Sequence, residues 1–231
     1  MMNLTSEQLR QALRLYLVMG SSNCAEADPY AVLEGAIAGG ITMFQFREKG
    51  ANALQGQAKL ELGARLRRLC AQHAVPFIVN DDERLALELE ADGIHIGQED
   101  APAAEIRRRL KGMIVGVSAH DLGEAESALA AGADYLGVGP QYATRTKHDA
   151  REVQGPAVLE RMRVGGIQLP IVGIGGIDAD KARAVIRAGA DGVAVVSAIS
   201  QARSPREAAD QLLSIISNSL GGIINDNDIK G

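Results

Sequence analysis

A short motif recurs where predicted helices end, and it constrains the fold of this chain more than any other feature. Residues 131–134 read Ala-Gly-Ala-Asp, residues 188–191 repeat these four letters, and looser versions stand at 91–93 and 38–40. The glycine can adopt the left-handed conformation that ends a helix and turns the chain. An apolar segment of strand length follows each time. The motif therefore predicts a repeating joint between a helix and the next strand.

Eight apolar segments of strand length lie between such joints. They span residues 14–19, 42–46, 76–80, 93–97, 114–118, 135–139, 170–174 and 192–196. Nearly continuous apolarity is typical of parallel strands that are covered on both faces. Because 231 residues also fit one such domain, we predict an α/β fold, a single (β/α)8 TIM barrel. A doubly wound open sheet is the alternative, since hydrophobic periodicity does not reveal closure.

The end of the chain changes in composition. From about residue 220 the sequence becomes polar and rich in glycine, which is typical of a loose segment. We therefore predict a catalytic barrel over residues 1–219 and a flexible C-terminal tail over 220–231.

Composition and charge narrow the classes of partner. A net charge of −5 leaves no basic surface for nucleic acid, and 3% aromatic residues without tryptophan disfavour base stacking. The longest apolar run, residues 193–199, is far shorter than the roughly 18 residues of a membrane helix. Cys24 and Cys70 lie far apart without metal-like spacing, and no leader precedes them. We expect a cytoplasmic protein that binds small charged molecules, and neither nucleic acid nor membrane.

A cationic cluster follows the second predicted strand, at the end of the barrel where such folds place their chemistry. It reads Gln45-Phe46-Arg47-Glu48-Lys49. Strand alternation puts Gln45, Arg47 and Lys49 on one side. The planar fork of arginine and the point charge of lysine suit a phosphate or pyrophosphate. A solvated loop is the alternative, although a charged triple aimed into the barrel would be costly without a ligand.

Carboxylates follow the next two strands. Asn80 and Asp81 end the third strand, and Asp100 follows the fourth. Both aspartates could simply cap helices. However, a carboxylate that faces a phosphate charge at about 4 Å would cost around 4 kcal/mol at an effective dielectric constant near 20. A cation should therefore lie between them, and hard oxygen ligands indicate Mg²⁺.

The remaining strands are followed by groups suited to a second anion. Ser118 follows the fifth strand, where it could donate to a phosphate or serve as an ordinary turn residue. The long loop after the sixth strand carries Thr144-Arg145-Thr146-Lys147, which favours a flap over an anionic substrate. Gly175-Gly176 and Val196-Ser197 follow the last two strands, where barrels bind a monophosphate through backbone N–H groups. Two anion sites on one rim predict two phosphorylated small-molecule substrates.

None of the four histidines receives a role from the sequence. His73 precedes a strand, His95 is embedded in one, and His148 lies beyond the loop lysine. His120 follows Ser118 closely, but a surface histidine or one satisfied by a neighbour is the more frequent case.

Taken together, these motifs resemble those of the thiamine-phosphate synthase family, and the resemblance extends from about residue 13 to about residue 218. The resemblance rests on Gln-x-Arg-x-Lys (45, 47, 49), Asn-Asp (80, 81), Asp100, Ser118, Thr-x-Thr-Lys (144, 146, 147), Gly-Gly-Ile (175–177) and Val-Ser (196, 197). It implies a dissociative, Mg²⁺-assisted transfer that joins a pyrimidine diphosphate to a thiazole phosphate. The products would be thiamine monophosphate and pyrophosphate.

The resemblance also implies roles for individual residues. Catalytic roles fall to Arg47, Lys49, Ser118 and Lys147. Contacts to the pyrimidine diphosphate fall to Gln45, Phe46, Arg47, Glu48, Lys49, Asn80, Ser118 and Lys147. Contacts to the thiazole phosphate fall to Thr144, Arg145, Thr146, Gly175, Gly176, Val196 and Ser197, with the choice between the two glycines open. The metal ligands would be Asp81 and Asp100.

Two other functions are alternatives for the same barrel. A sister family, the thiazole tautomerase, would make the chain an isomerase, but it needs no pyrophosphate and metal site. A non-catalytic phosphate sensor is the third class. A homo-oligomer is plausible for a small barrel, although the predicted helix exteriors offer no decisive patch.

Overall fold

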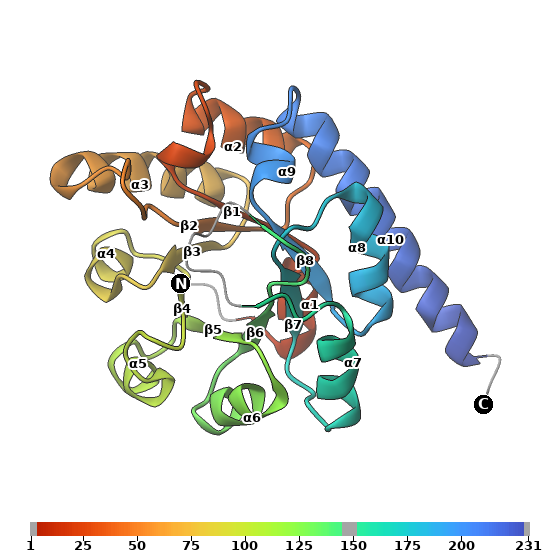
Figure 1. Cartoon of the computed structure of the whole chain (residues 1–231). Helices are drawn as coiled ribbons and strands as arrows, with labels where there is room; N and C mark the ends of the chain where they lie inside the picture. Colours follow the sequence, from red (N-terminus) through yellow and green to blue (C-terminus); the bar gives the residue numbers. More distant parts are fainter. Residues whose placement is uncertain (1–3, 145–151, 229–231) are drawn as a thin grey trace.

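The computed structural model describes residues 4–144 and 152–228. Within them, eight parallel strands close into a barrel in chain order (Figure 1). The strands are β1 (Leu15–Met19), β2 (Met43–Phe46), β3 (Phe77–Asn80), β4 (Gly93–Ile96), β5 (Ile114–Ala119), β6 (Tyr135–Val138), β7 (Ile171–Ile174) and β8 (Gly192–Val195). Each lies within one residue of its predicted bounds. The pairing of β1 with β8, which aligns Tyr16 with Ala194, closes the sheet and makes the open-sheet alternative wrong.

Helices alternate with the strands, and most of them form a ring around the barrel (Figure 1). They are α1 (Ser6–Ala12), the 3₁₀ turn η1 (Ser21–Asn23), α2 (Pro29–Ala38), α3 (Gly56–Gln72), α4 (Glu83–Glu88), α5 (Ala103–Arg109), α6 (Leu122–Ala130), α7 (Ala157–Val164), α8 (Ala179–Arg187), α9 (Ser197–Ser200) and α10 (Pro205–Asp228). The long helix α10 packs against α8 and α2. None of the described helices is long and apolar enough to cross a bilayer.

Alternation along the strands creates two apolar layers. On β1, Tyr16 and Val18 belong to the cluster inside the barrel, whereas Leu15, Leu17 and Met19 belong to the layer between strands and helices. Leu9 of α1 joins the inner cluster and so closes the bottom of the barrel. The near-continuous apolarity of each strand reflects burial on both sides.

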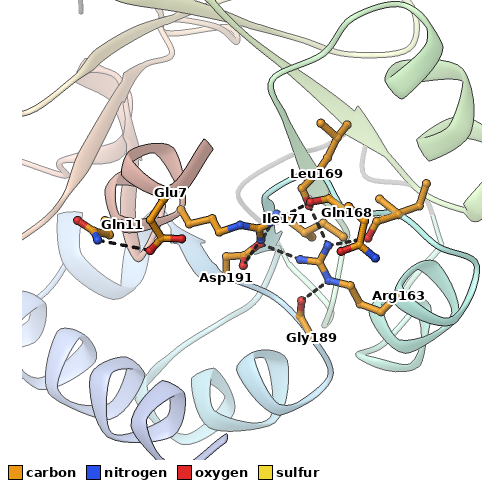
Figure 2. Close-up of polar contacts among 10 residues, drawn as sticks. Glu7, Gln11, Arg163, Gln168, Leu169, Ile171, Gly189 and Asp191 are labelled. Carbon is orange, nitrogen blue, oxygen red and sulfur yellow. Dashed lines mark hydrogen bonds and ion pairs between the residues drawn. The ribbon is translucent and has the colours of Figure 1, made fainter. Parts of the chain in front are cut away.

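The aspartate of the recurring motif ties the bottoms of neighbouring strands together. The carboxylate of Asp191 accepts the backbone N–H of Ile171, at the start of β7, over 2.7 Å. Arg163 of α7 donates to the same carboxylate over 2.7 Å and to the carbonyl oxygen of Gly189 over 2.8 Å (Figure 2). Arg10 of α1 binds the other carboxylate oxygen. One side chain therefore joins two strands and two helices.

The same arrangement recurs at two earlier joints. An aspartate just before an even-numbered strand accepts a backbone N–H near the start of the preceding strand, and an arginine from the helix before that preceding strand pairs with the aspartate. The members are Asp92 with Phe77 and Arg67, and Asp134 with Val115 and Arg107. The repeated letters of the sequence thus correspond to a repeated structural unit of two strands.

The predicted boundary between barrel and tail falls inside α10, which continues to Asp228. It therefore coincides with no element boundary in the described residues. The flexibility expected for residues 220–231 stays a prediction.

Candidate active site

One cavity of about 1140 Å³ opens where the strands end. It is lined by the predicted residues Gln45, Arg47, Lys49, Asn80, Asp81, Asp100, Ser118, Thr144, Gly175, Gly176, Val196 and Ser197. Arg145, Thr146 and Lys147 lie outside the described residues, so their predicted contacts stay predictions. The rim therefore brings the described part of both predicted anion sites into a single space.

Phe46 and Glu48 of the cationic cluster do not line this cavity, which corrects the prediction that both contact the pyrimidine diphosphate. Gln45 lines the floor of the cavity, whereas Phe46 belongs to the outer apolar layer and stacks on Phe77, with ring centroids 6.2 Å apart. The direct contact with substrate expected for Phe46 is wrong, because adjacent strand residues point to opposite faces.

Glu48 is also turned away from the cavity. Its carboxylate accepts the backbone N–H and the hydroxyl of Ser21 over 2.7 and 2.6 Å, and the N–H of Leu54 over 2.9 Å. These bonds fasten η1 to the loop after β2. Glu48 therefore supports the rim instead of contacting substrate.

The acidic side of the cavity is a compact group of like and unlike charges. The ammonium of Lys49 lies 2.7 Å from a carboxylate oxygen of Asp81. Partial burial and the neighbouring Asp81 raise the pKa of Asp100, against a bond from the Gly97 N–H that lowers it. The hydrogen bond to Asp81 in turn raises the pKa of Lys49. Two close carboxylates with one ammonium are suited to a divalent cation.

Helix capping does not explain these carboxylates. Asp82, not Asp81, caps α4, by accepting the N–H of Leu85 over 3.0 Å. Asp100 accepts the N–H of Gly97 over 2.7 Å, and α5 begins after Pro102. Asp81 itself has a left-handed backbone with φ of 60°. Such a conformation at a non-glycine residue often marks a functional position.

The opposite side of the cavity is lined by backbone. Gly175 and Gly176 have φ of 100° and 64°. A Cβ on Gly175 would lie 2.7 Å from Cα of Pro140, and one on Gly176 would lie 2.5 Å from the carbonyl oxygen of Ala143. Both positions require glycine, so the choice between them as phosphate contact stays open.

The turn after β8 completes this side. Val196 is the N-cap of α9 and Ser197 its first residue, and both line the cavity. The first N–H groups of a helix have no partner within the helix. Backbone from the last two strands is therefore suited to a phosphate.

Comparison with known proteins agrees with this geometry. The model of a family described as thiamine monophosphate synthase matches residues 15–199. A thiamine-phosphate synthase of Geobacillus thermodenitrificans is 52% identical and aligns over 94% of this chain and 97% of its own length. One of Bacillus velezensis is also 52% identical, over 96% and 99%. The chain belongs to the thiamine-phosphate synthase family. This membership confirms the resemblance seen in the sequence and the predicted class of activity, a transferase of thiamine biosynthesis.

A solved structure agrees as well. A thiamine phosphate pyrophosphorylase from Pyrococcus furiosus superposes with a TM-score of 0.82 at 35% identity, covering 92% of this chain and 99% of its own. The barrel and its family are thus supported by sequence and structure together.

Sequence reasoning missed a histidine that this member of the family places in the cavity. His95 lies on β4 between Ile94 and Ile96, which both belong to the outer layer. Its Nε2 is 3.0 Å from Oγ of Ser118, and its Nδ1 is 3.0 Å from the hydroxyl of Tyr135. The available signal was alternation, because a polar residue between two outward isoleucines must face inward.

His120 agrees with the interpretation made from the sequence. It lines the cavity, and its Nδ1 lies 2.7 Å from the carboxylate of Glu124 on α6. The ring is therefore satisfied by a neighbour.

Proposed function

We propose that this chain condenses 4-amino-5-hydroxymethyl-2-methylpyrimidine diphosphate with 4-methyl-5-(2-phosphoethyl)thiazole to give thiamine monophosphate and pyrophosphate. The single observation that carries this proposal is the shared cavity, which has charged side chains on one side and glycine-rich backbone on the other. Its volume of about 1140 Å³ is slightly above the usual range of ligand pockets, so it has room for two small substrates together.

Mg²⁺ is the metal that fits the acidic side. Asp81 and Asp100 would hold it, because their carboxylates are hard oxygen donors whose proximity leaves negative charge uncompensated. Among the residues that the structure describes, no three or more His, Cys, Asp or Glu side chains form a group that could hold a metal ion by themselves. The remaining ligands would then be water and diphosphate oxygens, as is usual for Mg²⁺. When bound, the ion neutralises charge that develops on the departing diphosphate.

The protein residues would support bond cleavage mainly by holding charge. The bond between the pyrimidine methylene and the diphosphate oxygen breaks, and its electron pair leaves with the diphosphate. Arg47 and Lys49 stabilise that negative charge, and Ser118 donates a hydrogen bond to it. The catalytic role of Lys147 remains a prediction from the sequence.

Capture of the second substrate completes the reaction. The lone pair of the thiazole nitrogen forms the new bond to the methylene carbon, and since this nitrogen carries no proton, no general base is required. Gln45 and Asn80 would orient the pyrimidine, while Thr144, Gly176 and Ser197 would hold the thiazole phosphate. The protein thus acts chiefly by positioning two reactants.

Pyrophosphate release tests this function directly. Purified protein with both substrates and Mg²⁺ should release pyrophosphate and form thiamine monophosphate in equal amounts. Omitting the thiazole phosphate or adding a chelator should stop product formation. Isomerisation of a thiazole without pyrophosphate would instead indicate the tautomerase, and binding without turnover would indicate a phosphate sensor. The cytoplasmic location and the homo-oligomer stay predictions.

A further inference from the structure

A continuous chain of hydrogen bonds crosses the floor of the cavity. The amide Nε2 of Gln45 lies 2.8 Å from the hydroxyl oxygen of Tyr16, which lies 2.9 Å from that of Tyr135. The Tyr135 oxygen lies 3.0 Å from Nδ1 of His95, and Nε2 of His95 lies 3.0 Å from Oγ of Ser118. Two residues expected to contact the pyrimidine substrate, on β2 and β5, are thereby connected through the barrel interior.

Both tyrosines are inaccessible and remain neutral phenols. Tyr16 and Tyr135 are 1% and 0% exposed, and their rings meet edge to face with centroids 6.1 Å apart. Burial raises the pKa of each phenol well above its ordinary value. Each tyrosine therefore has one hydrogen to donate, and the chain has a direction.

The direction follows from counting donors. An amide nitrogen only donates, so Gln45 gives its hydrogen to Tyr16, and Tyr16 gives its own to Tyr135. Tyr135 then donates to Nδ1 of His95, which places the ring proton on Nε2. His95 therefore donates its Nε2 hydrogen to Oγ of Ser118. The Ser118 hydroxyl hydrogen is then free to donate to a group in the cavity. With the Gln45 amide turned over, every bond reverses and the Ser118 hydrogen is held by His95.

We propose that Tyr16 and Tyr135 are positioning residues that couple the orientation of the Gln45 amide to the hydroxyl of Ser118. Neither tyrosine reacts. In the productive orientation, the Gln45 carbonyl is left to accept a hydrogen bond from the substrate, and Ser118 donates one to the diphosphate. A pyrimidine with an exocyclic amino group stabilises this orientation. A pyrimidine with a carbonyl in that place turns the amide over and withdraws the Ser118 donor.

This inference rests on the proposed function, in which Ser118 assists the departing diphosphate. Tyr135→Phe removes one oxygen and keeps the ring. We expect kcat for pyrophosphate release to fall about tenfold, the size of one hydrogen bond, with KM for the pyrimidine diphosphate nearly unchanged. Tyr30→Phe on α2 is the matched control, because its ring lies over Arg65 outside the chain of bonds, and it should leave kcat unchanged.

A double variant separates coupling from a merely structural role. In the Ser118→Ala background, Tyr135→Phe should change kcat less than about twofold, because its effect passes through the missing hydroxyl. A loss as large as in the wild-type background would overturn the proposal. Tyr16→Phe provides the same comparison if Tyr135→Phe does not fold.

Nitrogen NMR of the wild-type protein gives a readout independent of turnover. Labelled His95 should be neutral with its proton on Nε2, and Tyr135→Phe should produce a mixture of tautomers. A proton on Nδ1 in the wild-type protein with bound pyrimidine diphosphate would overturn the proposal. Absence of pyrophosphate release by wild-type protein would instead contradict the proposed function, while the NMR result would still report the direction of the chain.

Discussion

Lys49 and Asp81 form an ion pair of 2.7 Å between the ends of β2 and β3. The Lys49 side chain is 53% exposed, so this pair contributes little to stability and can exchange partners at low cost. In the proposed reaction, Asp81 and Asp100 would hold a divalent ion, which would supply the counter-charge of Asp81 in place of Lys49. The lysine is then available to the diphosphate, so metal and substrate binding should be coupled.

Removing Asp100 tests the metal site. We expect Asp100→Ala to lower kcat/KM for pyrophosphate release about 100-fold or more, because a bound metal contributes several kcal/mol to the transition state. The free energy of unfolding should change little, because relief of the repulsion between two close carboxylates offsets the lost hydrogen bond from the Gly97 N–H. Titration calorimetry should show loss of Mg²⁺-dependent diphosphate binding, and an active Asp100→Ala protein would remove the metal assignment.

The neighbouring carboxylate provides the control. Asp82→Asn alters the residue that caps α4 through the Leu85 N–H. We expect its free energy of unfolding to fall by no more than about 1 kcal/mol, while Mg²⁺-dependent turnover is retained. Urea denaturation and the turnover assay, applied to both variants, should therefore give opposite patterns.

Gly176→Ala tests the backbone-lined side. A Cβ there would lie 2.5 Å from the Ala143 carbonyl oxygen, so the loop must shift. We expect KM for the thiazole phosphate to rise between about tenfold and 100-fold. Gly155→Ala is the matched control, because its φ of 69° is similar but no atom lies within 4 Å of the added carbon. The free energy of unfolding should fall by roughly 1 kcal/mol in both variants, because alanine is disfavoured in the left-handed conformation. An equal rise in KM for both variants would contradict a role of Gly176 in binding the phosphate.

The two cysteines predict a pH dependence of stability. Burial raises the pKa of Cys70 to about 12 and that of Cys24 to about 11, the latter with help from Glu48 and Asp28. Unfolded thiols ionise near pH ~8.5, so folding favours the protonated form. Their contribution to stability is full below that pH and is lost as pH rises toward the folded values.

Urea denaturation at pH 7.5 and pH 10 checks this expectation. The free energy of unfolding should be lower at pH 10, and Cys70→Ala should reduce the difference. In the native protein at neutral pH, both thiols should react slowly with a thiol reagent. Rapid labelling of Cys70 in the native protein would contradict the burial of its thiol.

Asp191→Ala tests the tie at the bottom of the barrel. Burial already lowers the pKa of Arg163, and removing its carboxylate partner leaves a partly buried charge uncompensated. We expect a loss of about 3 kcal/mol in the free energy of unfolding. Glu88→Ala, which breaks an exposed pair with Arg84, should change it by less than about 0.5 kcal/mol. Similar losses for both variants would contradict the special role of the motif aspartate.

Much of the barrel could be predicted from the amino-acid sequence. Buried parallel strands are apolar throughout, and five of the eight follow a glycine with positive φ at the end of the preceding helix, so all eight strands were predicted to within one residue. The polar clusters were also predictable, because the end of a strand is where a polar residue can reach a barrel mouth. Gln45, Arg47 and Lys49 needed only strand alternation to be placed on the cavity side.

Contacts between distant strands could not be read in this way. The structure separates two chemically identical neighbours: Asp81 has a left-handed backbone and lines the cavity, whereas Asp82 caps α4. Tyr16 and Tyr135 look like ordinary apolar strand residues, yet their hydroxyl groups meet at 2.9 Å in the barrel centre. Local sequence carries the periodicity of burial, because that depends on neighbours along the chain. The partner of a buried hydroxyl depends on closure of the barrel, which brings residues 119 positions apart into contact.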